Sequence, residues 1–70
     1  MLVKDIFKVV DVGEVSRIIV IPKTQPVLGQ MPNEGRFISI SISDREKMEQ
    51  IADLEVEQLS VSNNMLTINV

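Results

Sequence analysis

QLSVSNNMLTINV, residues 58–70, predicts two strands joined by a short turn. Polar and apolar residues alternate on both sides of Asn63-Asn64, which is the pattern of two half-buried strands. Asparagine tolerates the positive φ that a two-residue type I′ turn requires, so the segment is predicted to be a hairpin. The register that follows places four apolar residues on one face, Val61 opposite Leu66 and Leu59 opposite Ile68.

Three segments that precede the hairpin also have the composition of strands. Residues 6–12 (IFKVVDV) are rich in β-branched types and are followed by a glycine. Residues 17–21 (RIIVI) form a continuous β-branched run that ends at Pro22, and we expect this strand to pair with the first one as a hairpin. Residues 37–43 (FISISIS) alternate strictly, which predicts a third, half-buried strand.

A short helix is predicted between the third strand and the final hairpin, from about Asp44 to Leu54. Ser43 followed three residues later by Glu46 fits a capping box, in which Ser43 is the N-cap. Apolar residues then recur at helical spacing, so the helix has one side that docks on the sheet. The predicted order is β-β-β-α-β-β in a single, mainly β domain over residues 1–70. A small five-stranded OB-like barrel has this order, and an open antiparallel sheet with one short helix is the alternative.

The composition excludes most catalytic chemistry. The chain has no His and no Cys, and its Ser, Thr and Lys residues stand in no nucleophile or phosphate-binding motif. We therefore expect a protein that is not an enzyme and that holds neither a cofactor nor a metal. At 70 residues without disulfides or zinc the core is small, so we expect a homo-oligomer that associates through an exposed strand edge or a loop.

Membrane insertion and secretion are not expected either. No apolar run approaches the roughly 20 residues that span a bilayer. The N-terminus shows no charged leader followed by an apolar block, which favours a cytoplasmic location.

The most informative irregular segment is residues 22–35, which hold all three prolines and two of the three glycines. A loop of this length is usually functional. Three apolar residues lie inside it, and we expect them to contact a protein partner: Val27, Leu28 and Met31. The alternative is a surface connection in which Val27 and Leu28 cover the open end of the predicted barrel.

Charge is segregated along the chain, whose formal net charge is −3. Residues 37–70 contain six acidic and two basic side chains, whereas the first half is nearly balanced. This predicts an acidic surface for a basic partner, with a simple solvated helix face as the alternative. The candidate contact residues are Glu46, Glu49, Asp53 and Glu57.

Direct binding of single-stranded nucleic acid is not expected, because the chain has only two Phe as stacking platforms and is acidic overall. Ser39, Ser41 and Ser43 fall on one face of the predicted third strand. These hydroxyls are typical of the wet side of a sheet, although they would also suit a phosphate or a small polar ligand.

Residues 17–23 (RIIVIPK), followed by Leu28-Gly29, resemble the motif of the swapped-hairpin AbrB-type DNA-binding family. In that motif Gly-Arg, two apolar residues and Ile-Pro precede a short basic helix that ends in Leu-Gly. The resemblance implies a dimer that contacts DNA through Arg17 and Lys23. Ser16 stands where the family has glycine, and residues 24–26 bring no arginine.

The function expected from the residues is that of a small non-enzymatic binding protein. It would be an adaptor or an inhibitor, of the kind that phages, other viruses and plasmids encode, and it would act through the proline-rich loop and the acidic helix. Two alternatives stay open at this point. One is the AbrB-type DNA-binding regulator, and the other is an oligomer that sequesters a small ligand or a nucleotide.

Overall fold

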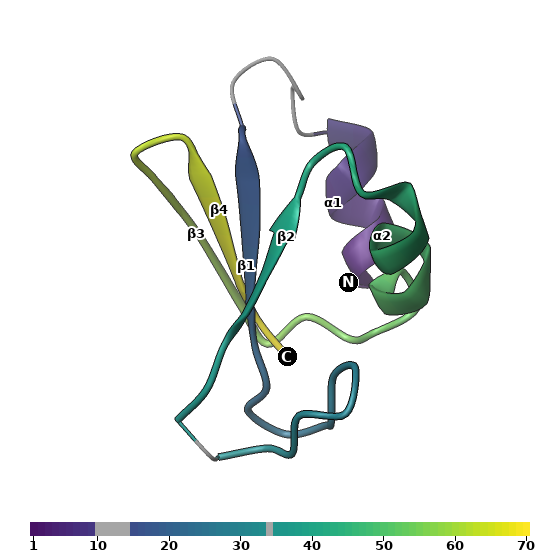
Figure 1. Ribbon diagram of the computed structural model, residues 1–70, viewed down its shortest axis with the longest axis vertical. Helices are drawn as coiled ribbons and strands as arrows, with labels where there is room; N and C mark the ends of the chain where they lie inside the picture. The colour runs from purple at the N-terminus through teal and green to yellow at the C-terminus, as the bar shows by residue number, and fades with distance from the viewer. Residues whose placement is uncertain (10–14, 34) are drawn as a thin grey trace.

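The computed structural model describes residues 1–9, 15–33 and 35–70. The described residues form two short helices and four strands (Figure 1). In chain order the elements are α1 (Val3–Val9), β1 (Arg17–Ile21), β2 (Ile38–Ser41), α2 (Arg45–Ile51), β3 (Gln58–Ser62) and β4 (Met65–Asn69). The mainly β prediction is confirmed. The predicted five-stranded OB-like barrel is wrong, because the described strands form an open sheet, and the alternative of a purely antiparallel sheet with one helix is wrong as well.

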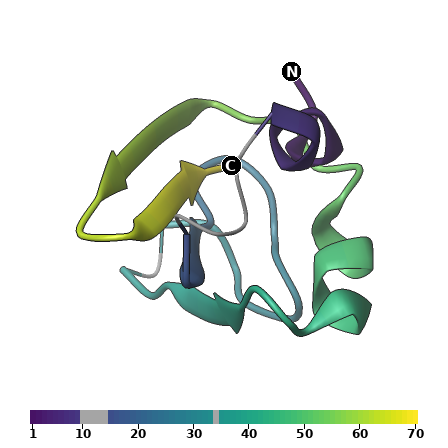
Figure 2. The same ribbon diagram turned by 90° about the horizontal axis from the view of Figure 1, so that it is seen from above.

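The sheet is mixed, with the strand order β2-β1-β4-β3. β1 is antiparallel to β2 and parallel to β4, and β3 is antiparallel to β4. Figure 2 shows the curved sheet from above with α1 and α2 on the same side of it. The domain therefore has two layers, a sheet and a pair of helices, and the opposite face of the sheet carries no helix among the described residues.

The central position of β1 explains its continuous apolar run. Ile18 and Val20 are fully buried on the helix side, while Ile19 on the other face is partly buried. β1 lies between β2 and β4, and Ile19 and Ile21 on its second face are partly buried, so β-branched residues suit both faces of this strand. The predicted strand at residues 17–21 is confirmed at the same bounds.

The N-terminal segment corrects the sequence prediction. Residues 6–9, predicted as part of a first strand, belong to α1, and the rest of that prediction, residues 10–12, lies outside the described residues. Val3 and Ile6 are buried three residues apart, which is helical spacing. The first-turn amide groups of α1 also have partners, because Val3 N donates to Leu54 O at 2.9 Å and Lys4 N donates to Ala52 O at 2.9 Å.

The predicted hairpin between residues 6–12 and 17–21 is wrong for the same reason. β1 instead forms an antiparallel pair with β2, in which Ile18 lies opposite Ile40. β2 lies within the predicted third strand at residues 37–43, and its alternation places Ile40 in the core.

α2 lies inside the predicted helix but begins one residue later than the capping-box pattern predicts. Asp44 is the N-cap, because its Oδ1 accepts a hydrogen bond from Lys47 N at 3.3 Å. The Ser43 hydroxyl is instead 3.0 Å from the Ser41 hydroxyl. A carboxylate at the N-cap also faces the positive end of the helix dipole, so Asp44 is favoured over Ser43 on electrostatic grounds.

The β3-β4 hairpin confirms the predicted turn and register. Asn63 and Asn64 have φ values of +52° and +63°, as a type I′ turn requires. The pairs Val61 with Leu66 and Leu59 with Ile68 are formed as predicted.

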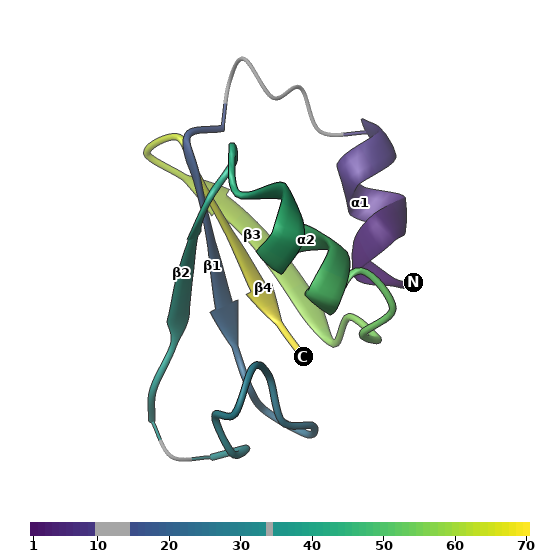
Figure 3. The ribbon, with the colours of Figure 1, turned by 45° about the vertical axis from the view of Figure 1, so that its right-hand side comes forward.

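The core lies between the sheet and the two helices (Figure 3). Each helix contributes its buried side, and the proline-rich loop and the C-terminus close one end. The buried residues are Val3, Ile6, Val15, Ile18, Val20, Val27, Ile40, Ile51, Leu66, Ile68 and Val70.

Candidate protein-binding surfaces

The proline-rich loop contains a tight two-residue turn at Leu28-Gly29. Val27 N donates to Gln30 O at 2.9 Å, and Gln30 N donates to Val27 O at 2.8 Å. Between them Leu28 has a φ of +45° and Gly29 has a φ of +87°. These are the positive φ values of a primed turn, which is usual for glycine or asparagine and unusual for leucine.

The base of this turn is fixed to the core and to the C-terminus. Val27 is only 1% exposed and belongs to the core. Thr24 donates to Val70 O twice, from its backbone N at 3.2 Å and from its hydroxyl at 2.7 Å. Gln25 Nε2 donates to Glu55 O at 3.0 Å. Residues 24–27 of the loop are therefore tied to segments that are distant in the sequence.

The structure separates the three apolar loop residues that the sequence grouped together. Leu28 and Met31 are at the surface, where 41% and 56% of their surface is exposed. Val27 is buried and anchors the loop. This matches the alternative in which Val27 folds back as a cover, whereas Leu28 does not follow it. Of the three, only Leu28 and Met31 present apolar surface to solvent.

Leu28 combines exposure with an unfavourable backbone conformation. A left-handed φ costs a residue with a side chain roughly 1–2 kcal/mol. Strained residues of this kind cluster at functional sites, where the surrounding structure holds them in place. Here the two Val27-Gln30 hydrogen bonds provide that restraint.

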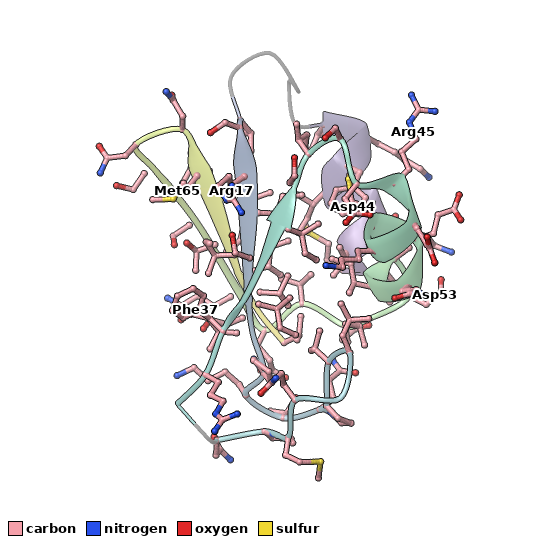
Figure 4. The ribbon with its side chains drawn as sticks, viewed as in Figure 1. Arg17, Phe37, Asp44, Arg45, Asp53 and Met65 are labelled. Atoms are coloured by element: carbon pink, nitrogen blue, oxygen red, sulfur yellow. The ribbon has the colours of Figure 1, made fainter. Side chains whose placement is uncertain are left out.

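The four predicted acidic contact residues do not form one surface of uniform sign. Glu46 and Glu49 are exposed on α2, but Arg45 and Lys47 lie on the same two turns. Asp53 forms an ion pair with Lys4 of α1, with Nζ and Oδ1 3.4 Å apart. Figure 4 shows Arg45 and Asp53 at opposite ends of α2. Glu57 is exposed further along the chain, directly before β3.

An open pocket of about 560 Å³ lies between the two helices, and the sequence did not indicate it. Phe7 of α1 is on one side, and Met48 and Ala52 of α2 are on the other. The composition of residues 6–12 predicts a strand, whereas Phe7 lines this pocket from a helix. The full lining is Phe7, Ile42, Ser43, Arg45, Met48, Glu49 and Ala52.

The residues of the DNA-binding and small-ligand alternatives lie elsewhere. Arg17 is on the sheet face that has no helix among the described residues. Its Nε donates to Ser39 Oγ at 2.9 Å, and Met65 is its paired residue on the neighbouring strand β4 (Figure 4). Lys23 is exposed in the loop after β1, and it is followed by bends at residues 24–25 and by the turn at Leu28-Gly29. Ser41 shares the face of Arg17, whereas its hydroxyl partner Ser43 lies at the pocket beside α2.

Two further observations concern the described part of the chain. Residues 1–9, 15–33 and 35–70 contain no group of three or more acidic, His or Cys side chains that could hold a metal ion. Over the same residues, neither helix has the length and apolar character that crossing a bilayer requires.

No protein-family model, curated protein or solved structure matches this chain.

Proposed function

We propose that this chain is a small non-enzymatic binding protein, an adaptor or an inhibitor, that contacts a protein partner through Leu28 and Met31 at the tip of its proline-rich loop. The observation that carries the proposal is the conformation of Leu28. An apolar side chain is held at the surface with a φ of +45°, where asparagine or glycine would be less strained.

The anchoring of the loop supports this function energetically. Binding costs conformational entropy whenever a mobile segment has to be ordered, and a loop already tied to the core and to Val70 avoids much of that cost. Leu28 and Met31 then supply apolar surface that a partner can bury. Exposed Glu46 and Glu49 on α2 would supply a second, polar contact, on a surface whose charge is mixed because Arg45 and Lys47 lie on the same turns.

In this proposal the protein acts in the cytoplasm and catalyses no reaction. Its effect on the partner is steric, because occupying a surface of the partner is sufficient for an adaptor or an inhibitor.

The test is affinity capture from an extract of the source cells, with the purified chain as bait. The double variant Leu28→Asn/Met31→Gln removes both apolar side chains. Asparagine is chosen at position 28 because it tolerates a left-handed φ. Met65→Gln, an exposed methionine on the sheet face, is the matched control. We expect a protein that is retained by the wild type and by Met65→Gln to be lost from the double variant.

Two results would overturn the proposal. One is a partner that binds the double variant as strongly as the wild type. The other is retention on DNA that weakens steeply as salt is raised, which would favour the regulator in which Arg17 and Lys23 contact phosphates.

A further inference from the structure

Among the described residues β3 is an edge strand of the sheet, and it lacks the charges and prolines that often protect an edge. Its sequence, Gln58–Ser62, contains no charge and no proline. All five residues are exposed. An uncharged edge strand without proline presents free backbone groups that can pair with another strand.

The core side of this edge is also apolar and uncovered. Leu59 and Val61 lie on the same face as buried Ile68 and Leu66, yet they are 40% and 64% exposed. At the opposite edge of the sheet the corresponding residue of β2, Ile40, is only 1% exposed. The apolar rows of the sheet therefore end inside the core at β2 but continue to the surface at β3.

The hairpin geometry determines which backbone groups of β3 are free. The two residues that flank a two-residue turn exchange hydrogen bonds, and such pairs alternate with non-bonded pairs along an antiparallel ladder. Ser62, which pairs with Met65 beside the turn, therefore directs its backbone groups toward β4. By alternation, Leu59 and Val61 direct theirs toward the open side.

We propose that a second copy of this chain pairs with this edge, β3 against β3, in an antiparallel arrangement with a two-fold axis at Ser60. Ser60 then lies opposite Ser60 of the second copy, and Leu59 lies opposite Val61. The result is one continuous eight-stranded sheet with the helices of both copies on the same side. The loop tips of the two copies lie at opposite ends of this sheet, so the dimer does not depend on the loop contact proposed above.

Self-complementarity selects this register over its neighbours. Only residues with free backbone groups can pair, which restricts the alignment to steps of two residues. A shift of one step places Val61 opposite Glu57, and a shift in the other direction places Leu59 opposite Asn63. The register centred on Ser60 pairs each exposed apolar residue with an apolar one and keeps the two Glu57 carboxylates at opposite ends of the interface.

The absence of cysteine from the chain allows a direct test of the register. In a non-hydrogen-bonded antiparallel pair the Cα atoms are about 4.5 Å apart, within the range that a disulfide bridges. Ser60→Cys is therefore expected to form a covalent dimer under mild oxidation. Ser62→Cys is the matched control on the same edge, because the two copies of residue 62 would be about 14 Å apart. We expect Ser60→Cys to cross-link at least about tenfold faster, and equal rates would overturn the proposal.

Sedimentation equilibrium provides the second test, with two variants of equal net charge. Val61→Glu places a carboxylate against an apolar residue of the second copy and is expected to raise the dimer dissociation constant at least about tenfold. Ser41→Glu places the same charge on the β2 edge, next to Arg17, and is expected to leave the dimer unchanged. Circular dichroism checks that both variants remain folded.

Three outcomes of the sedimentation experiment would overturn the proposal. A wild-type chain that stays monomeric at several hundred micromolar has no such interface. Growth beyond dimers together with sensitivity to Ser41→Glu would show head-to-tail pairing of β3 with β2, which forms open filaments. A dimer that is insensitive to Val61→Glu would place the interface on another surface.

Discussion

Val27 and Gln30 exchange two backbone hydrogen bonds, of 2.9 Å and 2.8 Å, and these bonds hold Leu28 at a φ of +45°. We expect Leu28→Asn to stabilise the fold by about 0.5–1 kcal/mol, because asparagine adopts the left-handed region at lower cost than leucine. The measurement is the midpoint of urea unfolding at an unchanged m-value.

Gly29→Ala is the counterpart of this variant in the same turn. A Cβ at Gly29 would meet nothing within 4 Å, so the cost of alanine in the folded state arises from the φ of +87° and not from a clash. We expect a loss of about 1 kcal/mol. If Leu28→Asn destabilised the protein as much as Gly29→Ala, the strain assigned to Leu28 would be absent.

Truncation of Ile6 tests the helical assignment of the N-terminal segment. Ile6 is 1% exposed, and we expect Ile6→Ala to lower the free energy of unfolding by about 2–4 kcal/mol. Lys8 is exposed, and Lys8→Ala should change it by less than about 0.5 kcal/mol. A strand would place residues 6 and 8 on the same face, so comparable losses at the two positions would contradict the helix.

The N-cap of α2 can be assigned by a pair of alanine substitutions. Asp44→Ala removes the acceptor of the Lys47 amide and is expected to cost about 1 kcal/mol, or a decrease in Tm of roughly 4–8 °C. Ser43→Ala should cost much less, because that hydroxyl bonds with Ser41 and does not cap the helix. Thermal melts followed by far-UV circular dichroism measure both, and a larger loss for Ser43→Ala would restore the capping-box assignment.

The ion pair between Lys4 and Asp53 is expected to contribute little to stability. Its atoms are 3.4 Å apart, but the Asp53 side chain is 86% exposed and is screened by solvent. Asp53→Asn should therefore lower the free energy of unfolding by less than about 1 kcal/mol at low salt, and by less still in 1 M NaCl. Guanidinium chloride is itself a salt, so urea is the denaturant for this comparison. An undiminished loss in 1 M NaCl would contradict a screened surface pair.

The parts of the fold that the sequence predicted depend on short-range patterns. The β3-β4 hairpin follows from alternation around Asn63-Asn64, and β1 follows from a β-branched run that ends at Pro22. α2 follows from apolar spacing after an acidic first turn. The capping-box pattern predicts Ser43 as the N-cap, one residue before the observed cap Asp44. In each case the residues that set the structure are within a few positions of one another.

α1 could not be predicted in this way. Its β-branched composition favours a strand, but its first-turn amides bond to carbonyl groups of Ala52 and Leu54, near the other end of the chain. The pocket between the helices was missed for the same reason, since Phe7 reaches it only when residues 3–9 are helical.

The candidate loop surface was partly predictable. Composition alone marked residues 22–35 as irregular and showed that they contain apolar side chains. Which of those side chains are buried could not be read from composition, because that depends on the Val27-Gln30 turn and on the hydrogen bonds to Val70.

Local alternation, turn residues and helical spacing therefore specify the strands of the final hairpin, β1 and α2 from the residues alone, because each of these is a preference of neighbouring residues. The strand order, the parallel pairing of β1 with β4 and the helical N-terminus are set by contacts between distant segments. Those contacts bury Val27 while they leave Leu28 at the surface, and they leave Leu59 and Val61 on an open edge. Burial is a property of the assembled layers, and no local pattern determines which part of an apolar face remains uncovered.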